Sequence, residues 1–221
     1  TVLKFPYFEK SEASEKQFKK IEGHKIGLNY SYGFSALENF EPFKMGKGIA
    51  SGDFNNDYWP DLAVSTEQGL HLYLNKEGTF QRVPFANLKG VPFLTAFLDI
   101  NNDGWKDLFV STYGGGNYFY LNEKGTFKKA IDLSDPKNII LTISAAFSDI
   151  DKDGDLDFFQ GNWSFGEVNF LKANLSTSIN RLYIKEGSSF KKAPFQDDLK
   201  GETLSSLFSD FNQDGMQDLS F

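Results

Sequence analysis

The sequence contains no cysteine, which excludes disulfide bridges, thiolate metal sites and cysteine nucleophiles. It contains only two histidines, His24 and His71, and no motif joins them into a catalytic pair. No apolar run approaches the roughly 20 residues that a membrane-spanning helix needs. A basic stripe of the kind that binds nucleic acid is absent as well, because the 23 lysines and arginines are scattered. The remaining chemistry rests on carboxylates, amides and aromatic rings.

Four acidic segments carry oxygen-bearing side chains at alternate positions. The clearest spans residues 149–157 and reads DIDKDGDLD; the others begin at Asp53, Asp99 and Asp210. Glycine at position six of three segments permits a tight turn with positive φ, and alternate residues of such a turn point inward. Ca²⁺ takes six to eight oxygen ligands at roughly 2.3–2.6 Å, whereas Mg²⁺ demands near-ideal octahedral geometry. The pattern therefore predicts up to four Ca²⁺ sites, with Mg²⁺ as the lesser candidate and plain solvated turns as the alternative.

The predicted ligands are the side chains at positions one, three, five and nine and the main-chain carbonyl oxygen at position seven. They are Asp53, Asn55, Asp57, Trp59 and Asp61 in the first segment; Asp99, Asn101, Asp103, Trp105 and Asp107 in the second; Asp149, Asp151, Asp153, Asp155 and Asp157 in the third; and Asp210, Asn212, Asp214, Met216 and Asp218 in the fourth. Because three segments have Asn at position three, the third segment is expected to bind most tightly.

The first segment departs from the pattern. Tyr58 stands at position six, where the other segments have Gly, and Pro60 stands at position eight. A bulky residue with positive φ costs on the order of 1 kcal/mol or more, so we expect a strained site there.

The net charge of -7 is concentrated in these segments. Outside the predicted side-chain ligands, 17 acidic residues face 23 basic ones. Four bound Ca²⁺ would bring the chain to a charge of about +1, so a nearly neutral metal-bound protein is expected.

The acidic segments begin 46, 50 and 61 residues apart, and each lies in the same sequence context. A small-residue strand precedes it and an apolar strand follows. A third strand with alternating apolar residues comes next, at residues 70–75, 118–122 and 181–184, and a short fourth strand closes the unit. Four antiparallel strands in a repeat of about 50 residues predict an all-β fold, a β-propeller with four-stranded blades. The rival β-sandwich leaves the recurring acidic segment unexplained.

The blades are expected to start near residues 46, 92, 142 and 203. Residues 1–45 form an N-terminal segment interpreted as a closing strand plus loop, in which residues 11–20 fit either a short polar helix or an exposed strand. Three full units and the start of a fourth do not close a ring. We therefore expect the chain to be part of a longer chain or complex.

The order of small-residue strand, Asp-x-Asn/Asp-x-Asp-Gly-x-x-Asp-Leu and Leu-Tyr-Leu-Asn-x-x-Gly-Thr-Phe resembles the FG-GAP/VCBS repeats of integrin α-chain propellers. It is more similar still to bacterial proteins like cartilage acidic protein, in which ASPIC/UnbV-type domains accompany such blades. The resemblance covers residues 45–221. It implies a calcium-binding, seven-bladed propeller used for adhesion or assembly in an extracytoplasmic setting, whether periplasmic, cell-surface or secreted.

Four metal-type segments without a catalytic constellation predict a non-enzymatic, calcium-stabilised propeller that presents loops to another protein. Residues 162–180, an insertion in the third unit, are the candidate contact surface; the alternative is a loop folded back on its own blade. A second reading is the propeller scaffold of a polysaccharide lyase or glycosidase. A third is a carbohydrate-binding module that uses Trp59, Trp105 and Trp163 as stacking platforms.

Two minor features have structural readings. His71 lies in an alternating strand, which indicates a surface or blade-interface role. Asn29, Asn162 and Asn174 each begin an Asn-x-Ser sequon, and these would be glycan acceptors only in a eukaryotic secretory protein.

Overall fold

The computed structural model describes residues 19–30, 48–85, 88, 90–113, 116–134, 140–164, 179–194, 199, 201 and 203–221. Within these residues the chain forms one short 3-10 helix, η1 (Gly23–Ile26), and otherwise only strands. The prediction of an all-β fold is therefore confirmed. Most of the N-terminal segment 1–45, with its helix-or-strand alternative, lies outside the described residues.

The strands form three four-stranded antiparallel sheets and one two-stranded hairpin, and sequence neighbours pair throughout. The first sheet contains β1 (Ile49–Gly52), β2 (Asp61–Thr66), β3 (Gly69–Lys76) and β4 (Thr79–Val83). The second, middle sheet contains β5 (Val91–Leu98), β6 (Asp107–Tyr113), β7 (Gly116–Asn122) and β8 (Phe127–Asp132), and the third contains β9 (Ile140–Ser148), β10 (Asp157–Ser164), β11 (Arg181–Glu186) and β12 (Ser189–Lys192). The hairpin contains β13 (Leu207–Ser209) and β14 (Asp218–Ser220).

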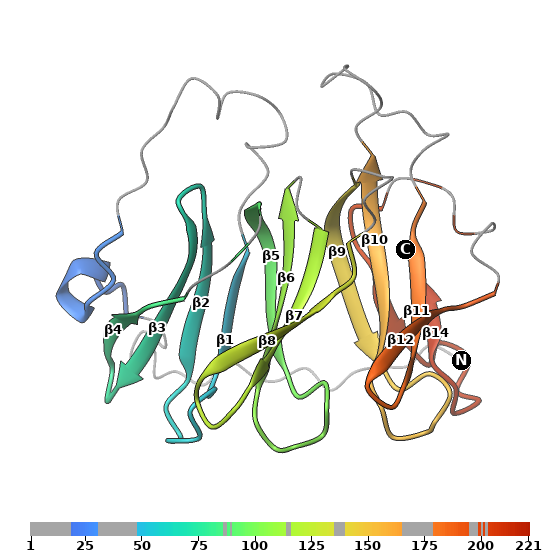
Figure 1. Ribbon diagram of the computed structural model, residues 1–221, viewed down its shortest axis with the longest axis horizontal. Helices are drawn as coiled ribbons and strands as arrows, with labels where there is room; N and C mark the ends of the chain where they lie inside the picture. Colours follow the sequence, from blue (N-terminus) through green and yellow to red (C-terminus); the bar gives the residue numbers. More distant parts are fainter. Residues whose placement is uncertain are drawn as a thin grey trace, which may run out of the picture.

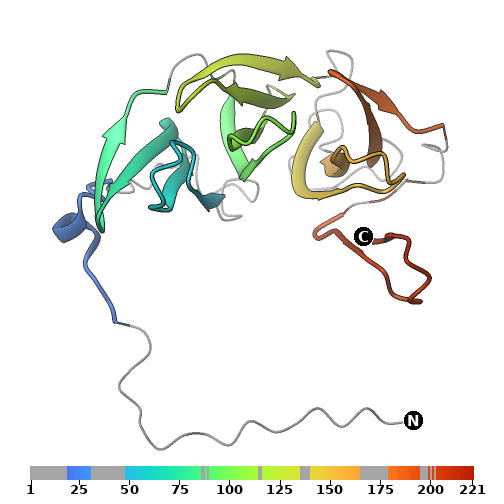
Figure 2. The same ribbon diagram turned by 90° about the horizontal axis from the view of Figure 1, so that it is seen from below.

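The sheets stand side by side along the longest axis of the molecule (Figure 1). Seen from below, they follow one another along an arc, and the β13–β14 hairpin comes after the third sheet (Figure 2). This is the arrangement of consecutive propeller blades. The number of blades in a closed ring stays a prediction.

The middle sheet has apolar side chains on both faces, and one face packs on the first sheet and the other on the third. Leu108 and Val110 of β6 pack with Leu72 of the first sheet. Phe109, which lies between them in sequence, packs with Phe158 of the third sheet, and their ring centroids are 5.0 Å apart. Successive side chains of a strand point to opposite faces, so one strand joins two interfaces. The middle sheet is accordingly buried on both sides.

The first and second sheets approach each other closely at the start of β1. A Cβ atom added to Gly48 would lie 2.8 Å from both the Phe93 carbonyl oxygen and the Thr95 amide nitrogen of the next sheet. The Gly48 amide itself donates to the Phe93 carbonyl oxygen at 2.6 Å. Any side chain at this position would push the first two sheets apart.

Candidate metal sites

The four acidic segments occupy equivalent places in the fold. Each connects the first and second strands of its sheet, between β1 and β2, β5 and β6, β9 and β10, and β13 and β14. The three loops of the four-stranded sheets lie at the same end of those sheets, at the bottom of Figure 1. Antiparallel pairing of the flanking strands begins at the last residue of each loop, where Asp107 pairs with Leu98 and Asp157 with Ser148.

Hydrogen bonds within the third loop turn its carboxylates inward. Asp149 accepts from the amide nitrogen of Asp153 at 3.1 Å and from that of Gly154 at 3.0 Å. Asp151 accepts from the Asp153 amide at 3.3 Å, and Asp153 accepts from the Asp155 amide at 2.8 Å. Each side chain thus wraps back over the turn, as Asx turns do.

The other three loops repeat this arrangement. The carboxylate at position one accepts from the amide at position five at 3.1, 3.0 and 3.0 Å in the first, second and fourth loops. The carboxylate at position five accepts from the amide at position seven at 2.9, 2.9 and 2.7 Å. The sequence pattern therefore encodes one backbone conformation four times.

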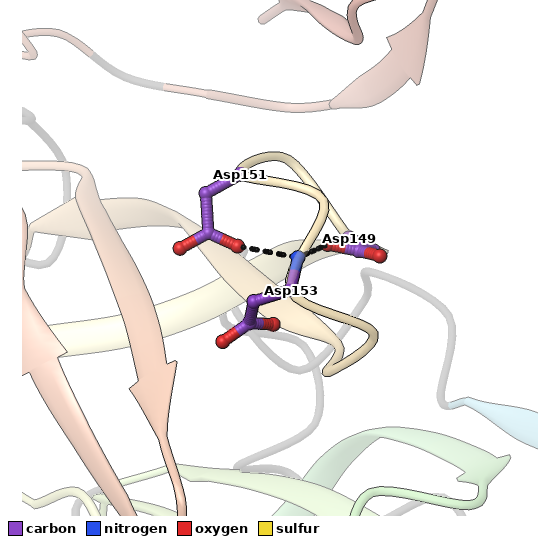
Figure 3. Close-up of side chains that lie close together, drawn as sticks. All are labelled: Asp149, Asp151 and Asp153. Atoms are coloured by element: carbon purple, nitrogen blue, oxygen red, sulfur yellow. Dashed lines mark hydrogen bonds between the residues drawn. The ribbon is translucent and has the colours of Figure 1, made fainter.

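The third loop brings its first three acidic side chains together. Asp149, Asp151 and Asp153 each offer a carboxylate oxygen, and these oxygens lie within 4.8 Å of one another (Figure 3). Oxygens that surround one Ca²⁺ at roughly 2.3–2.6 Å are separated by distances of this size. The donor set, which consists of carboxylates only, fits a hard cation.

In the other loops, the side chain at position three is an Asn amide, which forms a hydrogen bond with the carboxylate at position five. Asn55, Asn101 and Asn212 each donate their amide to the carboxylate at position five, at 2.9, 2.9 and 3.0 Å. Asp151 has no amide proton to give, so no such hydrogen bond relieves the mutual repulsion of the carboxylates in the third cluster, whereas a bound cation would relieve it. This difference agrees with the expectation that the third site binds most tightly, which stays a prediction.

The carboxylate at position nine has a second role that the sequence pattern did not indicate. Asp107 is fully buried, and it accepts from the amide of Ile100 at 3.0 Å and from that of Asn122 on β7 at 2.7 Å. The equivalent Asp61 and Asp157 make the same pair of bonds with their own loop and third strand. Position nine therefore fastens the acidic loop to the third strand. Its coordination of a cation stays a prediction.

Burial governs the protonation of these buried carboxylates. Desolvation raises the pKa of Asp107 to about 6, although its two backbone hydrogen bonds act in the opposite direction and the charges of Asp103 and Asp99 add to the rise. The pKa values of Asp61 and Asp157 are raised for the same leading reason. A divalent cation nearby would favour the ionised forms, because an opposite charge lowers a carboxyl pKa.

Two positions of each loop have left-handed backbone. Position six has positive φ in all four loops, as predicted, and Tyr58 adopts a φ of 72° without glycine's freedom. Position four has positive φ as well, between 57° and 64°, and this was not predicted. Its residues are Asn56, Asn102, Lys152 and Gln213. Asn adopts left-handed backbone more readily than most residues, so the Asn at position four of the first two loops was the sequence signal for this conformation.

Side chains at position four link neighbouring loops. Asn56 donates to the Gly104 carbonyl oxygen of the second loop at 3.3 Å. Asn102 donates to the Gly154 carbonyl oxygen of the third loop and to the Asp155 carboxylate, both at 2.9 Å. The acidic loops therefore contact each other from sheet to sheet.

Asn at the end of the third strand is a further residue that sequence reasoning recognised only as part of a strand. Asn122 donates to the carbonyl oxygens of Lys106 at 2.9 Å and Phe54 at 2.6 Å, and accepts from the Gly125 amide at 2.8 Å. It thus joins its own loop, its own turn and the loop of the preceding sheet. The third sheet has Lys185 at this position, and its ammonium lies 2.8 Å from the Asp155 carboxylate.

The tryptophans do not form one platform. Trp59 and Trp105 lie in the acidic loops, whereas Trp163 lies near the opposite end of β10, paired with Leu141.

The position-seven residues donate their amide hydrogens within the loops, and coordination of a cation through their carbonyl oxygens stays a prediction.

Other predicted features have clear positions where they are described. His71 is buried with 1% exposure, and the Tyr30 ring centroid lies 5.0 Å from its own. Asn162 is fully buried and donates to the Ile179 carbonyl oxygen, so it is not available to a glycan. Asn174 and residues 165–178 of the insertion lie outside the described residues.

Residues 99–159 match the family model of the FG-GAP-like repeat. The match and the series of antiparallel four-stranded sheets fit an FG-GAP repeat β-propeller, as the sequence resemblance predicted. The nearer likeness to the bacterial proteins stays a prediction. No curated protein matches the chain. In the described part of the chain, no helix has the length and apolar character required to cross a membrane.

Proposed function

We propose that this β-propeller-type domain binds Ca²⁺ in its acidic loops and uses the ions to stabilise a rigid, non-enzymatic interaction module. The observation that carries the proposal is the carboxylate cluster of Asp149, Asp151 and Asp153, whose ligand atoms lie within 4.8 Å of one another. The same loop conformation recurs in the other three hairpins, with Asn at position three. Ca²⁺ would there neutralise carboxylates that otherwise repel each other.

The positions of the loops support a structural role for the ions. Each loop joins the first two strands of a sheet, and position nine fastens it to the third strand through buried hydrogen bonds such as those of Asp107. A cation that orders the loop therefore orders the hairpin. Ligands that bind only the folded state raise stability by mass action, by about 2.7 kcal/mol per site at a concentration 100 times Kd.

Calcium titration of the metal-free protein tests the proposal. Protein stripped with EDTA and dialysed is titrated with CaCl₂ and separately with MgCl₂ by isothermal calorimetry, and its thermal unfolding is followed in parallel. One site filled to 100 Kd is expected to raise Tm by roughly 5–11 °C. A melting curve unchanged between excess Ca²⁺ and EDTA, with no binding heat, contradicts the proposal.

Two single substitutions assign the tightest site. Asp151→Asn gives the third loop the position-three residue of the other loops and is expected to weaken the tightest binding step. Asn101→Asp gives the second loop the all-carboxylate set and is expected to strengthen its binding. Glu186→Gln, an exposed carboxylate outside the loops, is the matched control and should change neither.

The module is proposed to act on another protein in an extracytoplasmic compartment, where millimolar-range calcium fills sites of moderate affinity. Its partner-binding function would then depend on Ca²⁺ only through the fold. Capture of a partner should therefore be lost in EDTA in parallel with the loss of folded protein, and not before it.

A further inference from the structure

A pocket of about 560 Å³ lies at the first sheet, between the segment around η1 and the strands β3 and β4. Tyr30 and Asn29 line it from the η1 segment, Gln68 from the β2–β3 turn, and Tyr73 and Arg82 from the sheet. Its size lies in the range of roughly 300–1,000 Å³ that is usual for small-molecule sites. It is separate from the acidic loops.

The wall of this pocket is held against the sheet by close backbone packing. Gly27 ends η1 with a φ of 88°, and a Cβ atom added to it would lie 1.9 Å from the Phe80 carbonyl oxygen of β4. The Tyr30 hydroxyl donates to the Glu67 carboxylate at the end of β2. The η1 segment is therefore fixed at two points, and Figure 1 shows it beside β4.

Tyr73 lines the pocket with a side chain that is only 3% exposed. Its hydroxyl is not among the fully enclosed polar atoms of the described residues, so it is open to a ligand in the pocket. A phenol hydroxyl can donate a hydrogen bond to such a ligand or accept one from it.

Among the described residues that line the pocket, Arg82 is the only one with a charged side chain. It lies directly across from Tyr73 in the β3–β4 pairing, is exposed, and forms no ion pair within the described part of the chain. A free guanidinium recognises a carboxylate with two parallel hydrogen bonds. The amides of Gln68 and Asn29 can donate to and accept from hydroxyls, and the rings of Tyr30 and Tyr73 offer apolar surface.

We propose that this pocket binds a hexuronic acid, either free or as the end of an acidic glycan, with Arg82 on the carboxylate and Tyr73 on a hydroxyl. One carboxylate with several hydroxyls on a compact ring matches the Arg82 guanidinium, the accessible Tyr73 phenol and the amides of Gln68 and Asn29. A bare inorganic anion would use Arg82 but would leave the aromatic and amide groups without a partner. This inference does not depend on the calcium sites.

Calorimetric and saturation-transfer NMR titrations with glucuronate, galacturonate and trigalacturonate test it. Uronates bind Ca²⁺ themselves, so the titrations are run in EDTA at a temperature where circular dichroism shows the folded protein. Glucose, galactose and inorganic phosphate serve as comparison ligands. Uronate binding at least about tenfold tighter than that of the neutral sugars is expected. Stronger binding of trigalacturonate than of galacturonate would identify a glycan end rather than a free sugar acid as the ligand.

Three variants separate recognition from folding. Arg82→Gln should weaken uronate binding by about tenfold or more, and Tyr73→Phe by about three- to tenfold, at unchanged Tm. Lys192→Gln alters the corresponding exposed cation of β12 in the third sheet and should have no effect. The inference is overturned if uronates do not bind at roughly 10 mM, if phosphate binds as well as they do, or if Arg82→Gln and Lys192→Gln bind alike.

Discussion

Replacement of Asn122 by Ala should destabilise the protein more than the same replacement of Asn75. Asn122 is the last residue of β7 and Asn75 is the second-last residue of β3, and both are buried, with 1% and 7% exposure. Asn122 makes three side-chain hydrogen bonds, to Lys106, Gly125 and Phe54. Asn75 makes only two, to Pro60 and Gly78. The extra bond of Asn122 crosses from the second sheet to the loop of the first.

The expected magnitudes follow from this count. A hydrogen bond contributes roughly 0.5–1.5 kcal/mol net, so Asn122→Ala should cost about 1.5–4.5 kcal/mol and Asn75→Ala about 1–3 kcal/mol. For a domain of this size 1 kcal/mol changes Tm by roughly 2–4 °C, so the two variants should melt roughly 1–6 °C apart. The assay is thermal and urea unfolding in EDTA, which removes any contribution of bound cations.

Hydrogen exchange localises the effect. Asn122→Ala should speed exchange of the Asp57 and Tyr58 amides, which lie in the loop of the neighbouring sheet and depend on its order. Asn75→Ala should leave the exchange of the second acidic loop, residues 99–106, unchanged. Equal losses of stability in the two variants, with no change in the first loop for Asn122→Ala, would refute the assignment of an inter-sheet bond to Asn122.

For three further substitutions, the structure predicts the direction in which stability changes. Tyr58→Gly should raise Tm by about 2–4 °C, since Tyr58 is 94% exposed, loses no packing and is relieved of its positive φ; a fall in Tm would contradict this. Burial lowers the pKa of His71 below its ordinary 6.5, with Arg82 acting in the same direction, so the unfolded state binds more protons at this site and the contribution of His71 to stability should fall as pH drops below about 6.5. The raised pKa values of Asp61, Asp107 and Asp157 act with the opposite sign, so the measurement is the difference in unfolding free energy between the unaltered protein and His71→Phe in urea titrations; a difference that does not change with pH would contradict the prediction. Asp155→Ala should cost roughly 3 kcal/mol or more because it strands the buried Lys185 ammonium, whereas Lys185→Met should cost less because Asp155 keeps Asn102 as a donor; equal costs in unfolding assays would argue against the buried pair.

The fold was predictable because local signals repeat. Alternating apolar residues in β3 and β7, glycine at position six and small residues before each acidic loop all predict hairpins at fixed spacing. The antiparallel order within every sheet then follows from short connections. The acidic loops were predictable for the same reason, because positions one, three and five act within one turn, where sequence distance and spatial distance coincide.

Contacts between sheets were not predictable from this pattern. The Asn122 bond to Phe54 joins residues 68 positions apart, and the Asn102 bond to Asp155 joins residues 53 positions apart. Both depend on how one sheet stacks on the next, which hydrophobic periodicity does not specify. The packing of Gly27 on Phe80 is of the same kind, since the N-terminal segment carries no repeat from which its position could be inferred.

The residue near the end of the third strand is Asn in the first two sheets and Lys in the third, and this difference is matched by a second difference in the acidic loop. Asn75 and Asn122 connect the strand to the acidic loop through an amide that donates and accepts. Lys185 cannot accept, and it instead pairs with Asp155, which is an acid at a position occupied by Trp or Met in the other loops. The two departures therefore compensate each other: an added negative charge in the third loop is matched by a positive charge on its third strand. This pair does not involve the carboxylates of Asp149, Asp151 and Asp153, which accept only backbone amide hydrogens in the described contacts; their use as a cation site stays a prediction.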